Sequence, residues 1–334
     1  MKILHPSRQR GLSLVELMVA IVLGLLLIGG VLQIFLSSNK TYKTNLALSE
    51  VQEAGRFAME FLTFDIRNAS YRGECVGSLN ELPDTSLKKK IKLNEDDRYQ
   101  LAPGLKGWDS TKKDNELPDW FTQKRLPGTD IILLKHAARP TEIKITHPPT
   151  PEIKTIKTSA ATNILTGELL LISEPVGCDI FQNNSAPATA SLSTSESFRY
   201  NYSLKSEVLK YNSSLYYISN SNNGIPSLWR IDYSNPDASS FEPEELVQGV
   251  QDMQIKYALG DDTGKITEDY VDAKDDLDWS RVVAVRVNLV SISHEKNIVP
   301  PGQEPQLNSA FKAIEDGRIG QVFSTTVGIR NRLP

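Results

Sequence analysis

Residues 12–36 read LSLVELMVAIVLGLLLIGGVLQIFL, and this stretch decides the fold of the N-terminal part of the chain. It contains 25 residues, no proline and one charged side chain, Glu16. As a helix rising 1.5 Å per residue it measures about 37 Å, enough to cross the hydrocarbon core of a bilayer. A carboxylate inside a membrane helix costs roughly 2.5–3.5 kcal/mol on insertion scales. A plain anchor gains nothing from that cost, so Glu16 indicates a further role.

Two ordinary classes of N-terminal segment fit this stretch incompletely. A secretory signal peptide has an apolar core of about 7–15 residues followed by a small-residue cleavage site. Residues 12–36 are longer than that, and no such site follows them. A single-pass anchor fits the length but leaves Glu16 unexplained, together with Gly11, which ends a short basic leader.

The segment Gly11–Glu16 resembles the type IV prepilin signal, in which a glycine precedes an apolar residue and a glutamate stands at the fifth mature position. The resemblance implies that a membrane-embedded prepilin peptidase removes residues 1–11 by cutting between Gly11 and Leu12. It also implies that the new N-terminal amine, on Leu12, is methylated. Many family members carry phenylalanine at this position, so Leu12 is a mild departure.

Stacking of such helices in a fibre gives Glu16 a physical purpose. The amine of Leu12 and the carboxylate of Glu16 would both be buried, and neither charge is tolerated alone. We expect Glu16 to pair with the Leu12 amine of a neighbouring subunit, or with its own before assembly, and so to set the register between subunits. The basic leader keeps the N-terminus in the cytoplasm, and the chain after Leu36 is expected outside the inner membrane.

Composition and cysteine content describe an ordinary exported domain. The charged fraction is 23% and the formal net charge is −4, so there is no basic excess and no nucleic-acid partner is expected. Cys75 and Cys178 would lie in an oxidising compartment, where a disulfide is the expected state. Closing a loop of about 100 residues contributes up to about 4.7 kcal/mol in the chain-entropy model. Free thiols or a shared metal are less favoured, because no further Cys or His stands at ligand spacing.

The helical pattern continues beyond the apolar stretch. We expect one helix over about residues 12–70, apolar all round over 12–36 and amphipathic over 37–72, with Gly73 as its left-handed cap. A stripe at helical spacing is expected to pack on the globular domain. It contains Ala47, Val51, Ala54, Ala58, Phe61, Leu62 and Asp65, with Phe57 and Ile66 alongside.

Residues 73–334 are predicted to form one antiparallel β-rich globular domain. Within it, residues 78–127 look irregular and predict a long loop or small subdomain with Trp108 and Trp120 turned inward and Lys88–Lys90 solvated. Strands are predicted at 130–137, 142–146, 168–173, 178–182, 197–204, 215–219, 227–232, 251–259, 280–293 and 321–330. Alternation along 280–293, the longest of these, indicates an antiparallel strand with one buried face. The predicted fold class is α+β, a long N-terminal helix packed on an antiparallel sheet, as in the pilin fold.

Three further segments resemble the PilW family of minor pilins. They are residues 55–67, followed by Tyr71-Arg72-Gly73 and Cys75, then residues 279–287 and residues 322–334. The resemblance implies a minor pilin of the type IVa pilus that joins other minor pilins, the major pilin and a large tip adhesin. Such a complex primes assembly and sits at the pilus tip, where it supports adhesion and twitching motility. A domain of about 260 residues on every subunit would crowd a shaft, so its size agrees with a rare position at the tip.

No pattern of an enzyme or cofactor site competes with this interpretation, and we expect no catalytic activity, no cofactor and no metal. The histidines, at positions 5, 136, 147 and 294, show neither metal nor triad spacing. The acidic stretch 261–278 lacks the register of a calcium loop, and a solvated hairpin is favoured. Two other functions stay open: a minor pseudopilin of a type II secretion system, and a DNA-uptake or surface-adhesion module.

Overall fold

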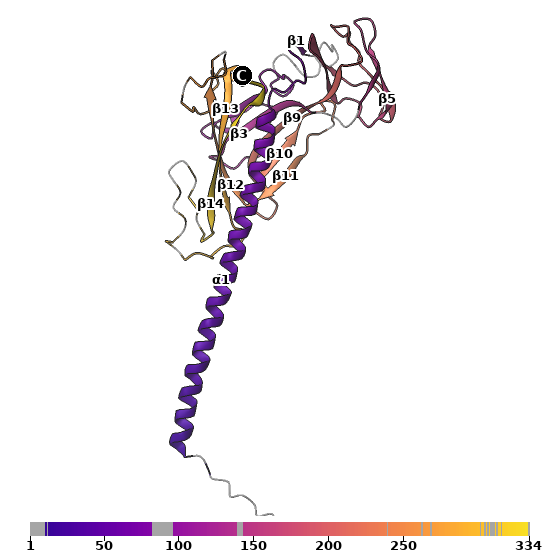
Figure 1. Cartoon of the computed structure of the whole chain (residues 1–334). Coiled ribbons are helices and arrows are strands. Elements are labelled where there is room, and N and C mark those ends of the chain that lie inside the picture. The colour runs from indigo at the N-terminus through magenta and orange to yellow at the C-terminus, as the bar shows by residue number, and fades with distance from the viewer. Residues whose placement is uncertain are drawn as a thin grey trace, which may run out of the picture.

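One long helix projects as a stem from a β-rich domain (Figure 1). The structure is a computed structural model that describes residues 11, 13–81, 96–138, 143–238, 240–261, 263–267, 269–300, 302–303, 305, 307, 311, 313–314 and 316–332. The helix, α1 (Leu14–Asn68), packs against the domain with its C-terminal part and extends away from it with its N-terminal half. The predicted α+β class, with the long N-terminal helix of the pilin fold on largely antiparallel sheets, is confirmed.

The largest sheet has eight strands and centres on β9 (Glu207–Asn220). Its main path runs β1 (Ser78–Glu81), β7 (Gly177–Gln182), β6 (Leu169–Glu174), β9, β10 (Pro226–Asp232) and β11 (Pro243–Gln248). Beside this path, β3 (Ile131–Ala138) pairs with β9, and β2 (Leu105–Trp108) pairs with β3. All these pairs are antiparallel except β1 with β7, so the prediction of a purely antiparallel sheet is wrong at this edge.

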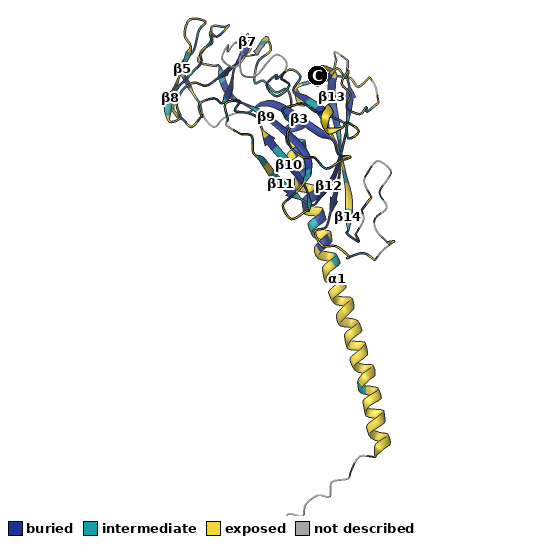
Figure 2. Ribbon diagram, turned by 180° about the vertical axis from the view of Figure 1, so that it is seen from behind, coloured by how far each residue is buried: buried dark blue, intermediate teal, exposed yellow. Residues whose placement is uncertain are grey.

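Two smaller sheets and three short 3-10 helices complete the domain. One sheet has the order β12 (Val250–Leu259), β13 (Val282–Ile292) and β14 (Gly320–Gly328), and the other has β4 (Ile145–His147), β5 (Thr155–Thr162) and β8 (Thr189–Ser193). The short helices are η1 (Asp114–Glu116), η2 (Trp279–Arg281) and η3 (Arg330–Arg332). The sheet β4–β5–β8 forms a lobe with its own core at the end of the domain farthest from the stem (Figures 1 and 2).

The main core lies between α1 and the sheets. Residues of α1 that were predicted to face inward are buried there: Ala54, Ala58, Leu62 and Ile66. They pack among residues of β3, β9, β12, β13 and β14. The prediction is wrong for Phe57 and Phe61, which are 49% and 39% exposed. Phe57 precedes the buried Ala58 by one residue, and that step turns a side chain about 100° around a helix.

The end of α1 also differs from the prediction. The helix stops at Asn68, and Ser70 takes the first left-handed backbone conformation, with φ of 64°. The N–H of Ser70 donates to the carbonyl of Lys135 in β3 at 3.0 Å. A hydrogen bond to the sheet therefore ends the helix, and Gly73, with φ of 68°, serves a later turn.

Most predicted strands are confirmed, but residues 197–204 are irregular, so that prediction is wrong. Phe198 and Tyr202 alternate into the core of the lobe, which is why the pattern resembles a strand. No described strand pairs with this segment, and the N–H of Arg199 donates instead to the carboxylate of Asp179 at 2.8 Å.

Several strands were not predicted: β1, β2, β5, β8, β11 and the first half of β9, which makes β9 the longest strand. β1, β2 and η1 lie in residues 78–127, where the prediction was a long loop or small subdomain without assigned strands. Trp108 and Trp120 do turn inward, with ring centroids 5.8 Å apart, whereas Lys88–Lys90 lie outside the described residues. β5 and β8 read TIKTSAAT and TASLS, and these short polar runs carry no apolar alternation.

β13 corresponds to the predicted strand 280–293 but is buried on both faces. It is the central strand between β12 and β14, and within it only Arg286 and Asn288 are partly exposed. One face packs into the main core under α1, and Val290 and Ile292 join a separate small cluster with Ile314. The prediction of a single buried face is therefore wrong.

Candidate functional site: the stem helix and its attachment to the domain

The N-terminus of α1 is closed by a reciprocal pair of hydrogen bonds. Ser13 is the N-cap, and its Oγ accepts from the N–H of Glu16 at 3.2 Å. In return, the N–H of Ser13 donates to Oε2 of Glu16 at 3.0 Å. This is a capping box, which satisfies backbone donors that a helix leaves unpaired. The spacing Ser-x-x-Glu before an apolar run is the sequence pattern of a capping box, and the sequence analysis did not predict one here.

The capping box places the Glu16 carboxylate at the tip of the stem. Gly11 is exposed just before it, whereas Leu12 and the leader residues 1–10 lie outside the described residues. The carboxylate of Glu16 therefore contacts Ser13, the residue that directly follows the predicted new N-terminus in the sequence.

The apolar half of α1 is exposed along its length (Figure 2). By length and composition it is the one candidate membrane span among the described helices. Large aliphatic side chains project on every side, and Leu26, Leu27 and Ile34 are 68%, 72% and 72% exposed. This surface exceeds what single exposed apolar residues account for, and it marks a membrane or assembly surface.

A second exposed apolar surface lies on the C-terminal half of α1, and we call it the phenylalanine stripe. It consists of Phe57, Phe61 and Phe64, with exposed fractions of 49%, 39% and 63%. Spacings of four and three residues bring these rings to one face of the helix. Two of these three rings, Phe57 and Phe61, were predicted to pack on the globular domain.

Charged side chains flank the stripe without partners among the described residues. Glu53, Arg56 and Glu60 make no side-chain hydrogen bond or ion pair there. Together with Phe57 they line a groove of about 690 Å³, whose other wall is Phe323 of β14 and its neighbours. This face of the helix therefore combines apolar rings with charges that only solvent satisfies in the single chain.

Gly55 allows β14, which forms one wall of this groove, to approach the helix closely. A Cβ at Gly55 would overlap the ring of Phe323. The glycine is thus required for close approach of sheet and helix, because no larger side chain fits without moving Phe323.

The buried face of the helix carries one carboxylate, Asp65, which is 8% exposed. The hydroxyl of Tyr216 in β9 donates to its Oδ2 at 2.7 Å, and Nε2 of His136 in β3 lies 3.3 Å from its Oδ1. Burial, and then the charge of Asp65, raises the pKa of Tyr216 well above its ordinary value, so the phenol stays a donor. Its helical spacing had put Asp65 on the buried stripe, but only the fold brings its partners to it.

A disulfide fixes the chain shortly after the helix. The predicted bond between Cys75 and Cys178 is present, with an S–S distance of 2.00 Å and Cα atoms 5.8 Å apart. Cys178 lies in β7, and β1, which follows Cys75, pairs with β7. The bond therefore ties the segment that leaves the helix to the edge of the large sheet.

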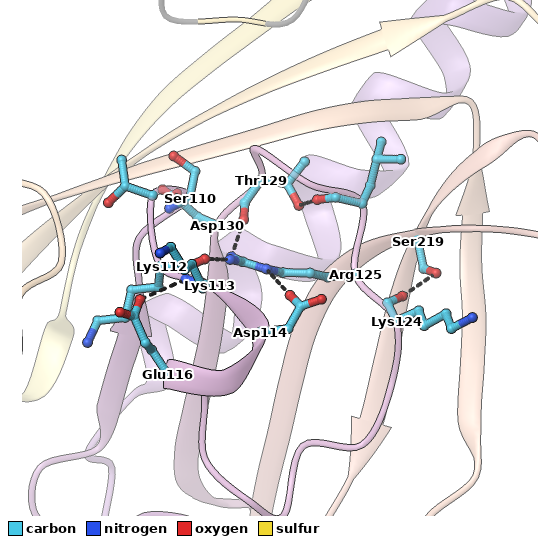
Figure 3. Close-up of polar contacts among 12 residues, drawn as sticks. Ser110, Lys112, Lys113, Asp114, Glu116, Lys124, Arg125, Thr129, Asp130 and Ser219 are labelled. Atoms are coloured by element: carbon cyan, nitrogen blue, oxygen red, sulfur yellow. Dashed lines mark hydrogen bonds and ion pairs between the residues drawn. The ribbon is translucent and has the colours of Figure 1, made fainter.

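A network of buried charges shapes the connection between β2 and β3 (Figure 3). Arg125 donates to the carbonyls of Thr129, at 2.9 Å, and Lys112. Asp130 accepts from the N–H of Ser110 at 2.7 Å and from the N–H of Ile255 at 2.6 Å. Burial raises the pKa of Asp130 to about 7, although these two donors oppose the shift. All these partners lie within the domain, so the network is structural.

The remaining candidates for chemistry do not converge on a site. Among the described residues, no group of three His, Cys, Asp or Glu is placed to hold a metal ion. His136 is buried against Asp65, and His147 and His294 are exposed, while His5 lies outside the described residues. The acidic stretch 261–278 forms the connection from β12 towards η2, and its members Asp262 and Glu268 also lie outside the described residues.

Comparison with known proteins matches both ends of the chain. Residues 215–331 match the family described as Type IV Pilus-assembly protein W, and residues 6–32 match the Prokaryotic N-terminal methylation motif. A solved type IV-like pilin from Thermus thermophilus shares 15% identity over 51% of this chain and 87% of that chain, with a TM-score of 0.21. No curated protein matches the chain.

The two family matches cover the parts of the structure described above. The first begins in β9 and runs through β10–β14 to η3, and it includes the sheet on which α1 packs. The second contains Gly11, Ser13, Glu16 and most of the exposed apolar half of the stem. The C-terminal third of the chain is thus similar to the PilW family, and its N-terminus is similar to the methylation motif.

Proposed function

We propose that this chain is a minor pilin of the type IVa pilus, made as a prepilin and placed at the pilus tip. Prepilin peptidase cuts it between Gly11 and Leu12, and the amine of Leu12 is then methylated. Residues 12–36 anchor it in the inner membrane with the N-terminus in the cytoplasm and residues 73–334 in the periplasm. Its partners are other minor pilins, the major pilin and a large tip adhesin. It acts as a structural subunit that initiates assembly, and adhesion and twitching motility depend on it.

The exposed apolar stem with a carboxylate at its tip is the observation that carries this proposal. The stem has no partner within the described part of the chain, so it requires a bilayer or the stems of other subunits. The size of the domain supports a rare position, because about 260 residues on every subunit would crowd a shaft.

Glu16 has two successive partners in this proposal. In the single chain its carboxylate accepts from the N–H of Ser13, the residue that follows Leu12 in the sequence. We expect it to pair there with the amine that cleavage creates on Leu12. In the fibre the carboxylate takes the amine of a neighbouring subunit. A buried pair of this kind adds little net stability, but leaving one charge unpaired is expensive, so the pair selects one register.

The phenylalanine stripe supplies a second contact along the same helix. We assign it to the amphipathic helix of another minor pilin, because it continues the exposed stem on the same element. Glu53 and Glu60 flank the stripe with negative charge and have no partner among the described residues. Basic side chains on the partner helix would satisfy them, and an acidic side chain would satisfy Arg56 on the same face.

The test of the function is a strain that lacks this gene, complemented with the wild-type chain. Surface pili and twitching are expected to be lost on deletion and restored by complementation, while exoprotein secretion stays normal. Loss of secretion with intact pili would assign the chain to a type II secretion system as a minor pseudopilin and overturn the proposal.

The test of the stripe uses a photo-crosslinking benzoyl-phenylalanine in place of Phe61. The expected adduct contains another pilin, and the same group at Leu204, an exposed residue in the distal lobe, should not form it. The triple variant Phe57→Ser, Phe61→Ser, Phe64→Ser should lower incorporation into pili at an unchanged membrane level. A matched control carries serine at the exposed positions Leu165, Val176 and Leu204. Equal incorporation of both triple variants would exclude the stripe as a contact.

A further inference from the structure

A loop that follows β13 runs along the stem towards the membrane segment. We call residues 294–300 the membrane-proximal loop. The N–H of His294 donates to the carboxylate of Glu50 at 3.4 Å, and Nζ of Lys43 lies 2.7 Å from Oε1 of Glu295. These contacts hold the loop to the helix at Glu50, beside the first buried residues Ala47 and Val51, and at Lys43, one turn before Ala47 and nearer the apolar stretch.

The far end of the loop reaches the last residue of the apolar stretch. Ile298, Val299 and Pro300 line a groove of about 350 Å³ together with Leu36, Asn39, Lys40 and Lys43 of α1. Ile298 is buried there, Val299 is half-buried and Pro300 is exposed. An apolar tip of the domain therefore lies at the height of Leu36.

Helix geometry places that height at a membrane surface. From Leu14 to Leu36 the helix rises about 33 Å, against about 30 Å for a hydrocarbon core. The next two turns then fall in the headgroup layer. They carry Lys40, Tyr42 and Lys43. Tyrosine is enriched at both membrane interfaces, and lysines near the end of a membrane helix extend to the interface.

Charge around the loop favours an anionic surface. Lys43 forms an ion pair with Glu295. Nζ of Lys296 lies 3.2 Å from Oδ2 of Asp316, and Nε of Arg318 lies 3.5 Å from Oδ1 of the same carboxylate. Lys40 is exposed and makes no ion pair among the described residues. The basic side chains outnumber the acidic ones, so the described surface is positive on balance.

We propose that, before assembly, the membrane-proximal loop rests on the periplasmic headgroup layer of the inner membrane. Val299 and Pro300 lie at the acyl boundary, and Lys40 and Lys296 contact lipid phosphates. The contact holds the domain at a defined angle to the bilayer, and it must break when the subunit enters a fibre. This inference rests on the proposed insertion of residues 12–36 in the membrane.

Fluorescence quenching in vesicles tests the inference. The full-length chain with Pro300→Cys carries a bimane on its one free thiol, since Cys75 and Cys178 are bonded to each other. It is reconstituted in vesicles of phosphatidylethanolamine and phosphatidylglycerol that contain a shallow nitroxide lipid. We expect loss of emission and a blue shift, whereas the label at Leu204→Cys stays unquenched. The pair Lys40→Glu and Lys296→Glu should reduce the quenching, and the distal pair Lys157→Glu and Lys205→Glu should not.

Flotation of the same vesicles separates this inference from the proposed function. If the chain floats with the lipid but the label at position 300 is no more quenched than at position 204, the loop contact is wrong and the anchor stands. If quenching appears only at a high ratio of protein to lipid, a second copy covers the loop and the inference is also overturned. If the chain does not float, both the anchor and the loop contact fail.

Discussion

At the scale of one residue, the carboxylate of Glu16 has a capping role in the structure and an assembly role in our proposal. Its Oε2 accepts from the N–H of Ser13, which supports the first turn of α1. The same geometry puts a negative charge at the helix N-terminus, where the amine of Leu12 would form. Because both roles use the same atoms, only variants that keep one and remove the other distinguish them.

Three substitutions at the cap separate the two roles. Glu16→Gln keeps an acceptor for Ser13 but removes the charge, and Ser13→Ala removes the cap hydroxyl at a cost of about 1 kcal/mol but keeps the charge. We expect Glu16→Gln and Glu16→Ala to be processed normally and to fail in assembly, while Ser13→Ala assembles. Cleavage by mass spectrometry and the amount of chain in sheared pili measure the two steps. Assembly of Glu16→Gln at the wild-type level would show that capping, not charge, is the requirement.

Asp130 predicts a dependence of stability on pH. Burial raises its pKa from 3.8 to about 7, so between these values the folded chain keeps a proton that the unfolded chain has released. Stability therefore falls as the pH rises from about 4 to about 7 and levels off above that range. Melting temperatures over pH 4–8 should show this slope, and Asp130→Asn should flatten it. The exposed Asp119→Asn is the control, and an unchanged slope in Asp130→Asn would assign the effect elsewhere.

At the scale of elements, the contact of α1 with β14 depends on a missing side chain. Gly55→Ala should lower stability, because its Cβ overlaps the ring of Phe323. Combined with Phe323→Ala, the same substitution should cost much less, since the obstructing ring is gone. A double-mutant cycle by chemical unfolding measures this coupling. Additive losses would mean that the helix shifts away from β14 rather than clashing with it.

The contact of α1 with β3 and β9 depends on a buried carboxylate. Asp65→Ala should cost about 1–3 kcal/mol, because it leaves the hydroxyl of Tyr216 without its acceptor. Asp65→Asn retains an oxygen acceptor and should cost less. Thermal unfolding compares both variants with Glu60→Ala, which removes an exposed carboxylate from the same helix. Equal stability of Asp65→Ala and Glu60→Ala would contradict the proposed anchoring.

At the scale of the whole molecule, the disulfide links the end of the stem to the far edge of the large sheet. Replacing both Cys75 and Cys178 by serine should lower the free energy of unfolding by about 2–5 kcal/mol. Unfolding in denaturant with intact and replaced cysteines measures the loss, and wild-type chain treated with reductant should match the double variant. Because α1 also packs on β13 and β14, the helix should stay attached to the domain in the double variant.

The distribution of correct and incorrect predictions follows from the range of the interactions. The existence of α1 and of most strands was predictable because it depends on local periodicity. The strand predicted at residues 197–204 is wrong because Phe198 and Tyr202 alternate in burial although no described strand pairs with them. β5 and β8 were missed because they pair with each other although their polar sequences show no apolar alternation. The prediction failed for Phe57, whose ring is exposed, whereas Asp65 was correctly placed on the buried stripe and only its distant partners could not be predicted.

The sequence by itself determined that this protein has a basic segment ending in Gly11, an apolar stem with Glu16 at its tip, one long helix and a β-rich domain. Those properties reside in runs of neighbouring residues, where hydrophobicity and helical spacing act over a few turns. Only the tertiary structure decided that Phe57, Phe61 and Phe64 face outward, that Asp65 meets Tyr216, and that the membrane-proximal loop descends to Leu36. Such contacts join residues far apart in the chain, and side-chain type at either position does not specify them until the sheets have folded.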